Sequence, residues 1–237
     1  MTMKTIGVLG GIGPQATMQF EQLVHRAAQR LVPQRFNSGY PPMVAYYLRD
    51  VPFVADASGV RPREPLEPNP KLLDAARVLG AAGDFLVIIS NGTHLLRPHV
   101  ERASGRPVLS IIEIVVREVQ RRGWRKVGVL GLGHPRVYTG ALDELHVAHE
   151  TIDAPLRDAL DDGIFGSMEG RVEARWTSAA LEAIEQLRGR GVDGVILGCT
   201  EIAIVLGEDN MRRLMEDGNV INPLELLADA AVRHAMA

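Results

Sequence analysis

The chain carries one cysteine, Cys199, and its surroundings suggest a thiol that exchanges protons. It follows an apolar run that ends at Leu197 and precedes a stretch with helical periodicity. We therefore expect it at the carboxyl end of a strand and near the N-terminus of a helix. That position can lower the pKa of a thiol below its usual value of about 8.5 and so supply thiolate at neutral pH. The alternative is a cysteine that packs as a small apolar residue. The flanking Gly198 and Thr200 favour the functional thiol.

A polar segment that runs from Ser90 to His94 also follows an apolar run. The hydroxyl groups of Ser90 and Thr93, the amide of Asn91 and the backbone N–H groups around Gly92 could hold a carboxylate. An N-cap serine at a strand-to-helix turn accounts for the same residues without a ligand. The sequence thus offers one hydroxyl and one thiol as candidate positions for chemistry.

Comparison of the chain with itself shows that Ser90 and Cys199 occupy equivalent positions in two repeated segments. Two pairs of segments align, namely Lys4–Pro14 with Arg125–Pro135 and Gly80–Ser90 with Gly189–Cys199. The second alignment sets Asp84 over Asp193 and Ser90 over Cys199. Because both matches occur in the same order, we infer a gene duplication.

Short β-branched runs alternate with helical stretches, which predicts parallel sheets covered by helices on both faces. The expected strands are Thr5–Leu9, Met43–Leu48, Phe85–Ile89, Val108–Ile112, Val127–Leu130, Gly194–Leu197 and Val220–Ile221. The expected helices include Lys71–Leu79, Ala180–Arg188 and Pro223–Ala235. The fold class is therefore α/β, with two duplicated flavodoxin-like αβα lobes related by a pseudo-twofold axis.

We expect lobe one to span residues 1–106, lobe two to span 107–206, and residues 207–237 to return to lobe one. In open parallel sheets, ligands bind beyond the carboxyl ends of the strands. Ser90 and Cys199 are predicted at such ends, and a pseudo-twofold axis would direct both toward a common cleft.

Other binding chemistries find little support in the sequence. The turn at Gly10–Pro14 resembles a dinucleotide-binding fingerprint, but the acidic residue expected about 20 positions later is missing. His146 and His149 have helical spacing without a third convergent ligand for a metal. The only lysines, Lys4, Lys71 and Lys126, are not placed to form a Schiff base with pyridoxal phosphate. We expect neither a metal nor a cofactor.

The composition is that of an ordinary globular protein. Of the 237 residues, 46% are hydrophobic and 23% are charged, and the net charge is -3. No basic run interleaved with aromatic residues points to nucleic acid. No apolar stretch approaches the roughly 20 residues that span a bilayer, and the N-terminus lacks the pattern of a signal peptide. A single cysteine fits a reducing compartment, so we expect a cytoplasmic protein.

Taken together, these motifs resemble the aspartate/glutamate racemase family, in the larger group that also contains hydantoin racemases, maleate isomerases and arylmalonate decarboxylases. The resemblance covers essentially the whole chain. It rests on the segment Ile6–Pro14 with Ala16 and Thr17, on Asn91 and His94, and on Gly198–Glu201.

The resemblance implies an enzyme that needs no pyridoxal phosphate and acts on a small amino or carboxylic acid, as a homodimer. Two thiols flank the substrate α carbon in such enzymes, and one removes a proton while the other delivers one. Cys199 corresponds to the second thiol and Ser90 stands where the first belongs. Gly11, Ile12, Asn91, Gly92, Thr93 and Thr200 would hold the substrate carboxylate, and Arg49 could clamp a side-chain carboxylate or form a surface salt bridge.

This chain departs from the family pattern at Ser90, at Gly92, where a threonine is expected, and at Asn222-Pro223 and Leu227, where an Asp-Thr pair and a histidine are often found. A serine hydroxyl is too weak an acid to supply an alkoxide base at neutral pH. The main hypothesis is a racemase that prefers one enantiomer. The alternatives are an arylmalonate-type decarboxylase that uses Cys199, and a carboxylate-binding protein without activity.

Overall fold

A computed structural model describes residues 3–57, 59, 61–133 and 135–237. The chain forms two compact units, the first made of Met1–Ser110 with Leu227–Ala237 and the second of Ile111–Leu226. Each unit contains a four-stranded sheet in which every pair of neighbouring strands is parallel. The predicted α/β class with two parallel sheets is confirmed.

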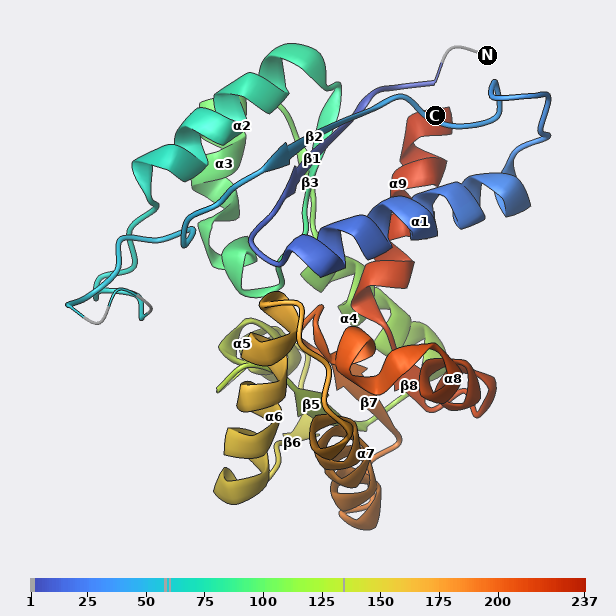
Figure 1. Ribbon diagram of the computed structural model, residues 1–237. Coiled ribbons are helices and arrows are strands. Elements are labelled where there is room, and N and C mark those ends of the chain that lie inside the picture. The colour runs from blue at the N-terminus through green and yellow to red at the C-terminus, as the bar shows by residue number, and fades with distance from the viewer. Residues whose placement is uncertain (1–2, 58, 60, 134) are drawn as a thin grey trace. The chain divides into compact units, whose positions relative to one another are not determined.

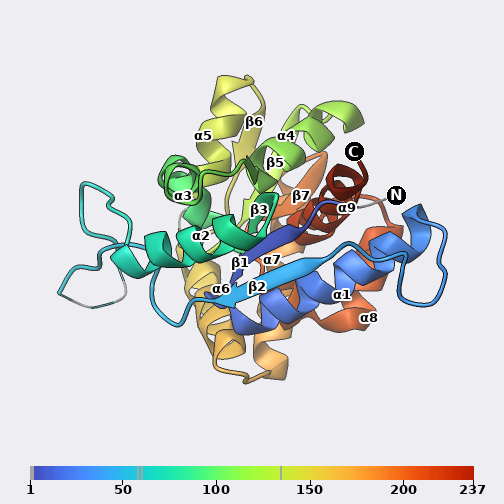
Figure 2. The same ribbon diagram turned by 90° about the horizontal axis from the view of Figure 1, so that it is seen from above.

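The first unit has the strand order β2-β1-β3-β4, and β2, β1 and β3 are seen side by side in Figure 2. The strands are β1 (Ile6–Gly10), β2 (Met43–Tyr47), β3 (Phe85–Ile88) and β4 (Val108–Leu109). Its helices are α1 (Pro14–Leu31), α2 (Pro70–Ala82), the short 3₁₀ helix η1 (Gly92–Leu96), α3 (Arg97–Ser104) and most of α9 (Pro223–Met236), whose first residues up to Leu226 belong to the second unit. Helices α2 and α3 lie on one face of the sheet, and α1 and α9 lie on the other (Figure 1). Between β2 and α2 the chain leaves the sheet and is held by two antiparallel bridges, Phe53 with Pro68 and Ala55 with Pro62.

The second unit has the order β6-β5-β7-β8. Its strands are β5 (Lys126–Leu130), β6 (Ala148–Glu150), β7 (Gly194–Leu197) and β8 (Val220–Ile221). Its helices are α4 (Ile111–Arg122), α5 (Arg136–Glu144), α6 (Ala154–Met168), α7 (Ala174–Gly189) and α8 (Ile202–Glu216). One apolar cluster joins α6, α7 and α8 to the sheet, and a second joins α4 and α5 to it. Both faces of this sheet are therefore buried, as its continuous apolar strands require.

The internal repeat appears as equivalent hydrogen bonds in the two units. The carboxylate of Asp84 accepts a hydrogen bond from Thr5 N at 2.7 Å, and that of Asp193 accepts one from Lys126 N at 2.9 Å. Thr5 and Lys126 are matched by the sequence alignment, as are the two aspartates. The common strand order and this shared contact support the inferred duplication.

The boundaries of the units differ from those expected from the sequence. Residues 207–226, which we assigned to lobe one, lie in the second unit because α8 packs on α6 and α7 and β8 pairs with β7. Residues 107–110 lie in the first unit because β4 pairs with β3. The expected strand Val108–Ile112 ends at Leu109, since the apolar residues that follow form the buried stripe of α4.

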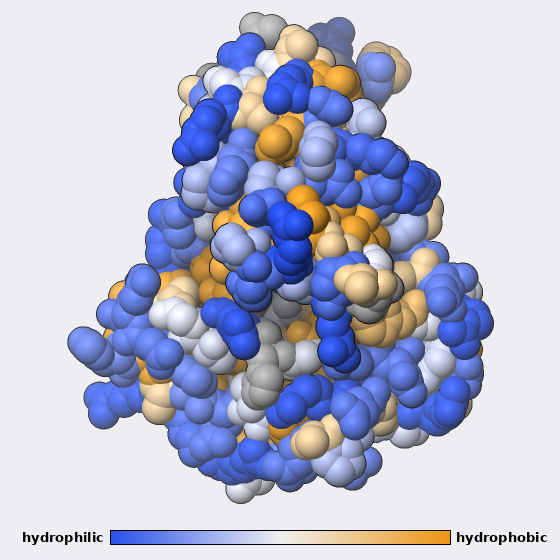
Figure 3. All heavy atoms as spheres, turned by 90° about the vertical axis from the view of Figure 1, so that its left-hand side faces the viewer, coloured by the Kyte–Doolittle hydropathy of each residue, from blue (hydrophilic) through white to orange (hydrophobic). Residues whose placement is uncertain are grey.

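Hydrophilic side chains cover most of the face drawn in Figure 3, and apolar ones appear in separate patches. Within the described ranges, no helix combines the length and the apolarity that crossing a bilayer requires.

Candidate active site

Cys199 lies where the sequence predicts it, between the end of β7 and the start of α8. Gly198, the residue before it, donates from its N–H to the carbonyl of Leu130 at 2.6 Å. A Cβ at position 198 would lie only 2.5 Å from the same oxygen, so this close approach to β5 requires glycine. The carbonyl of Cys199 accepts a hydrogen bond from Ile202 N at 3.2 Å, at the first turn of α8. The thiol is thereby fixed at the carboxyl edge of the sheet.

The Cys199 side chain contacts a buried carboxylate. Its Sγ donates to Oε2 of Glu201 at 3.1 Å, and the hydroxyl of Thr200 donates to the same oxygen at 2.8 Å. Glu201 and Thr200 are 5% and 6% exposed, whereas Cys199 remains partly exposed. The thiol therefore has a buried carboxylate within hydrogen-bond distance that can accept its proton.

Burial, followed by the neighbouring Glu201 carboxylate, raises the pKa of the Cys199 thiol well above its ordinary value. The lowered pKa expected from the helix N-terminus is therefore wrong, because desolvation and the carboxylate outweigh the helix dipole. Burial also raises the pKa of Tyr138, whose ring packs against Gly198. At neutral pH Cys199 is a protonated thiol that needs a proton acceptor before it can act as a base.

Ser90 lies just beyond β3, at the start of the turn that leads into η1. Its Oγ accepts hydrogen bonds from the Thr93 hydroxyl at 2.8 Å and from Thr93 N at 3.4 Å. Asn91 and Thr93 are each 3% exposed, and Gly92 is exposed with no heavy atom within 4 Å of where its Cβ would lie. Ser90 and the three residues predicted beside it thus form one turn, which the Ser90 hydroxyl stabilises through its two hydrogen bonds with Thr93.

His94 is buried beneath this turn and contacts the backbone of Ser90 rather than its hydroxyl. Its Nδ1 lies 2.9 Å from the Ser90 carbonyl oxygen. Burial lowers the pKa of His94 to about 4, although hydrogen bonds to the backbone favour the protonated form. The ring is therefore neutral at physiological pH, and it is not placed to take the Ser90 hydroxyl proton.

The glycine turn after β1 is fixed by an internal hydroxyl. Gly11 N donates to Thr17 Oγ1 at 2.8 Å, and the same hydroxyl donates to the carbonyl of Gly13 at 2.9 Å. Gly11 has φ +80°, and a Cβ there would lie 2.5 Å from the Cα of Tyr47. The backbone N–H of Gly11 is therefore already bonded within the turn, and this residue and Ile12 contribute shape rather than that donor.

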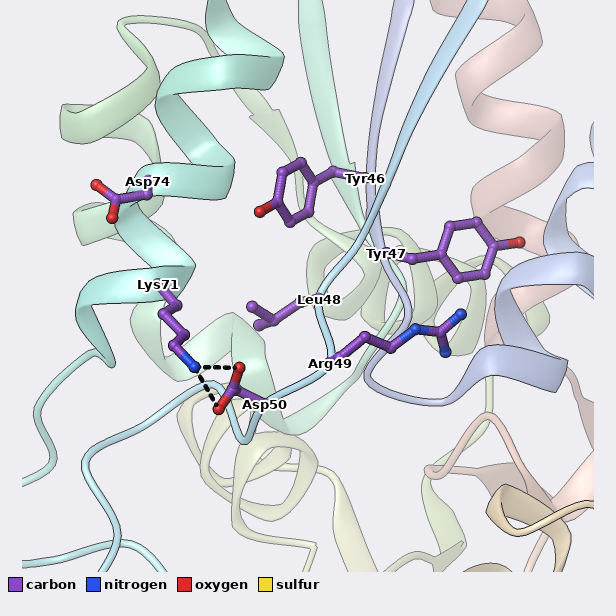
Figure 4. A pocket seen from close by; sticks show the side chains of 7 residues that line it. All are labelled: Tyr46, Tyr47, Leu48, Arg49, Asp50, Lys71 and Asp74. Atoms are coloured by element: carbon purple, nitrogen blue, oxygen red, sulfur yellow. Dashed lines mark hydrogen bonds and ion pairs between the residues drawn. The ribbon is translucent and has the colours of Figure 1, made fainter.

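Arg49 follows β2 and lines a hollow of about 230 Å³ beside α2 (Figure 4). Its guanidinium lies 5.0 Å from the centre of the Tyr47 ring, whereas Asp50 is paired with Lys71 at 2.9 Å. In the part of the chain that the structure describes, Arg49 forms no ion pair, so of the two roles left open for it the surface salt bridge is not found. Its charge is available to an anion.

Glu201 is the residue of this site that the sequence analysis left without a role. The signal was present, because an acidic residue follows the cysteine by two positions at the start of a helix, where a carboxylate is favoured. Sequence could not reveal that its side chain turns back toward the thiol. Within the described residues, no group of three or more His, Cys, Asp or Glu side chains is arranged to hold a metal ion.

Comparisons with known proteins agree with this fold. The chain is 25% identical over 204 residues to the broad specificity amino-acid racemase RacX of Bacillus subtilis (strain 168), with 85% of this chain and 87% of that protein covered. A putative Asp/Glu racemase from Yersinia pestis superposes with a TM-score of 0.73 at 23% identity, covering 99% of this chain and all (100%) of that one. The aspartate racemase of Picrophilus torridus superposes with a TM-score of 0.72 at 22% identity, covering 98% and 94%. The family model described as Asp/Glu/Hydantoin racemase matches residues 9–231, so the chain belongs to the Asp/Glu/hydantoin racemase family.

Proposed function

We propose that this protein is a cofactor-independent amino-acid racemase, an isomerase in which Cys199 moves the proton at the substrate α carbon. The observation that carries the proposal is the 3.1 Å hydrogen bond from Cys199 Sγ to the buried carboxylate of Glu201 at the carboxyl edge of the sheet. Membership of a racemase family and the similarity to a broad specificity amino-acid racemase support it.

The proton path begins at the Cys199–Glu201 pair. Glu201 takes the thiol proton and becomes a carboxylic acid, and the thiolate then removes the α proton of the substrate. The electron pair of the broken C–H bond passes into the substrate carboxylate, which becomes an enediolate. Hydrogen-bond donors aimed at that carboxylate stabilise the charge, and such preorganised donors are usually the largest contribution to catalysis.

We assign the second proton transfer to Ser90, because the family resemblance places the second acid–base group at this position. A serine hydroxyl cannot supply an alkoxide base at neutral pH, but it can donate a proton to a carbanion that is a far stronger base. The resulting alkoxide regains its proton from water, and Glu201 returns the thiol proton to water, so both groups are restored. Deprotonation on the Cys199 side is therefore fast, whereas inversion is slow. The two enantiomers have equal free energy, so the enzyme cannot favour one of them at equilibrium. The difference between the two groups instead makes one enantiomer exchange its α proton with solvent faster than it inverts.

We assign substrate binding to the groups around the two positions. Asn91, Gly92, Thr93 and Thr200 hold the α-carboxylate, Gly11 and Ile12 shape the pocket, and the unpaired Arg49 attracts a side-chain carboxylate. The homodimer and the cytoplasmic location implied by the sequence stay predictions.

The experiment uses the full chain in deuterated water with both enantiomers of alanine, lysine, aspartate and glutamate. Mass spectrometry measures deuterium at the α carbon, and chiral chromatography measures inversion. We expect one enantiomer to gain deuterium faster than it inverts. Cys199→Ser should lower both rates by about 10²-fold or more, the range of acid–base catalysis.

Two results would overturn the proposal. One is full exchange activity in Cys199→Ser, which would remove the thiol from the mechanism. The other is release of carbon dioxide from phenylmalonate with no exchange of any amino acid, which would establish the decarboxylase instead. The exposed serine of α7, substituted as Ser178→Ala, serves as the matched control because its hydroxyl bonds to the Ala174 carbonyl of its own helix and makes no described contact with Cys199.

A further inference from the structure

Helix α8, which begins directly after the Cys199–Glu201 pair, is broken at Gly207. This residue has φ +76° and ψ 163°, values that lie outside the helical region and that glycine adopts far more readily than other residues. The helix therefore consists of a short first segment, residues 202–206, and a longer second segment, residues 208–216. Glu201 is the N-cap of the short segment, so the position of its side chain depends on how that segment is held.

The break interrupts the hydrogen bonds of the helix, and two side chains supply donors in their place. In a continuous helix each carbonyl accepts a hydrogen bond from the N–H four residues later, a pattern that cannot pass through a residue with a non-helical backbone. The carbonyl of Val205 instead accepts from the hydroxyl of Thr177 on α7 at 2.7 Å. The carbonyl of Leu206 accepts from the side-chain amide of Asn210 at 2.8 Å. Asn210 lies within α8 itself, whereas Thr177 ties the short segment to a neighbouring helix.

Val205 links Thr177 to Glu201. Its N–H donates to the carbonyl of Glu201 at 2.9 Å, and its own carbonyl accepts from Thr177. Val205 is 2% exposed and lies in the apolar cluster that joins α6, α7 and α8 to the sheet. The path from Thr177 to the backbone of Glu201 therefore consists of two hydrogen bonds through one buried residue.

The short segment depends on tertiary contacts, because one or two turns of helix have little stability by themselves. The contact that it must preserve is strict. The Glu201 carboxylate lies 3.1 Å from Cys199 Sγ, and a hydrogen bond weakens as its distance and angle depart from their ideal values. We propose that Thr177 is a positioning residue that holds Glu201 against Cys199. This inference rests on the proposed racemase, in which Glu201 accepts the thiol proton, and it concerns the rate of that step rather than the binding of the substrate.

The test removes the Thr177 hydroxyl and then restores it, using the amino acid that the unmodified protein exchanges fastest. Thr177→Val keeps the size and branching of the side chain but takes this donor from the Val205 carbonyl. We expect kcat for α-proton exchange in deuterated water to fall about tenfold and KM to change less than about twofold, because displacing an acid–base group slows the chemical step. Thr177→Ser keeps the hydroxyl and should restore kcat to within about twofold of the original value. Ser178→Ala, which removes the hydroxyl of the next residue on α7, is the control and should leave kcat unchanged.

A second measurement follows the contact between Cys199 and Glu201 without any substrate. Burial and, after it, the Glu201 carboxylate raise the pKa of Cys199, so displacing that carboxylate in Thr177→Val should lower the pH midpoint of iodoacetamide alkylation. The other titratable groups near the thiol, Asp161 and Tyr138, lie on α6 and α5, so the shift reports on Glu201. If Thr177 only stabilised the fold, its loss would lower the free energy of unfolding without moving this midpoint.

The two measurements decide the role of Thr177 together. A lower kcat and a lower alkylation midpoint in Thr177→Val, both reversed in Thr177→Ser, would support the assignment. An unchanged midpoint, or a rise in KM with kcat unchanged, would overturn it and leave the racemase standing. If Thr177→Val does not fold, Thr177→Ala compared with Thr177→Ser gives the same answer. If the unmodified protein exchanges no amino acid, the proposed function itself fails, and the midpoint still decides whether Thr177 positions Glu201.

Discussion

The hydrogen bond between Cys199 and Glu201 gives one carboxylate two opposite effects on the thiol. As a negative charge it raises the thiol pKa, and as a proton acceptor it opens the route to thiolate. The chain has a single cysteine, so the ionisation of this thiol can be followed without background. The two roles of Glu201 are therefore separable by experiment.

Replacing Glu201 by glutamine should lower the pKa of Cys199 and still slow the reaction. The amide removes the charge that opposes the thiolate, but it cannot take the thiol proton. We expect the pH midpoint of iodoacetamide alkylation to fall, while the α-exchange rate drops by about 10²-fold. Glu208→Gln, an exposed glutamate on α8, is the control. If the α-exchange rate rises as the alkylation midpoint falls, Glu201 does not act as the proton acceptor.

Placing a thiol at position 90 should speed the slow half of the reaction. In Ser90→Cys the second group can act as a base as well as an acid, so the disfavoured enantiomer should exchange its α proton at least about tenfold faster. Chiral analysis of exchange in deuterated water measures this, with Ser178→Cys as the control for adding a thiol. An unchanged rate for that enantiomer would contradict the proposed role of Ser90.

At the scale of elements, the sequence predicted the strands that are apolar and missed the one that is not. β6 (Ala148–Glu150) contains a polar and a charged residue, and it forms because three of its residues pair with β5, a contact between distant segments. The run from Val108 to Ile112 was predicted as one strand, yet β-branched residues also form helices when their spacing buries one face. The ends of the strands that precede Ser90 and Cys199 were predictable from apolar runs. The contact between Glu201 and Cys199 was not, because it depends on the direction of the Glu201 side chain.

The turn between β1 and α1 depends on one buried hydroxyl, and its removal should destabilise the first unit. In Thr17→Val the N–H of Gly11 would lose its partner in a site where Thr17 is 0% exposed. Leaving a buried donor unsatisfied costs about 1–3 kcal/mol. Urea denaturation measures the free energy of unfolding, and Ser178→Ala should change it by less than about 0.5 kcal/mol. A Thr17→Val protein as stable as the original would show that water replaces the hydroxyl.

At the scale of the whole molecule, the repeat was the most informative part of the sequence. It predicted two duplicated lobes with parallel sheets. The structure adds that the two sheets have equivalent strand orders and that the aligned residues Asp84 and Asp193 make the same backbone contact in both units. The assignment of residues 207–226 failed because α8 and β8 complete the second sheet, and periodicity carries no information on which sheet a segment joins. The equivalent positions of the two units nevertheless differ in chemistry. In the first unit the hydroxyl of Ser90 lies in the turn above the neutral ring of His94, and in the second the thiol of Cys199 contacts a carboxylate.

The buried His94 should make the stability of the protein fall between pH 6.5 and 4. Its pKa is lowered from 6.5 to about 4 in the folded chain, chiefly by burial. Over that interval the unfolded chain binds a proton at this residue and the folded chain does not, so acidification favours unfolding, by up to roughly 3 kcal/mol. We expect urea denaturation at pH 7 and pH 5 to show a larger loss of unfolding free energy for the unmodified protein than for His94→Asn, by about 2 kcal/mol.

The variant His94→Asn keeps a donor for the Ser90 carbonyl, and His25→Asn, on the exposed side of α1, controls for the loss of a histidine. If the free energy of unfolding falls equally in the unmodified protein and in His94→Asn, His94 accepts its proton without unfolding. The turn that carries Ser90 would then tolerate a charged imidazole beneath it.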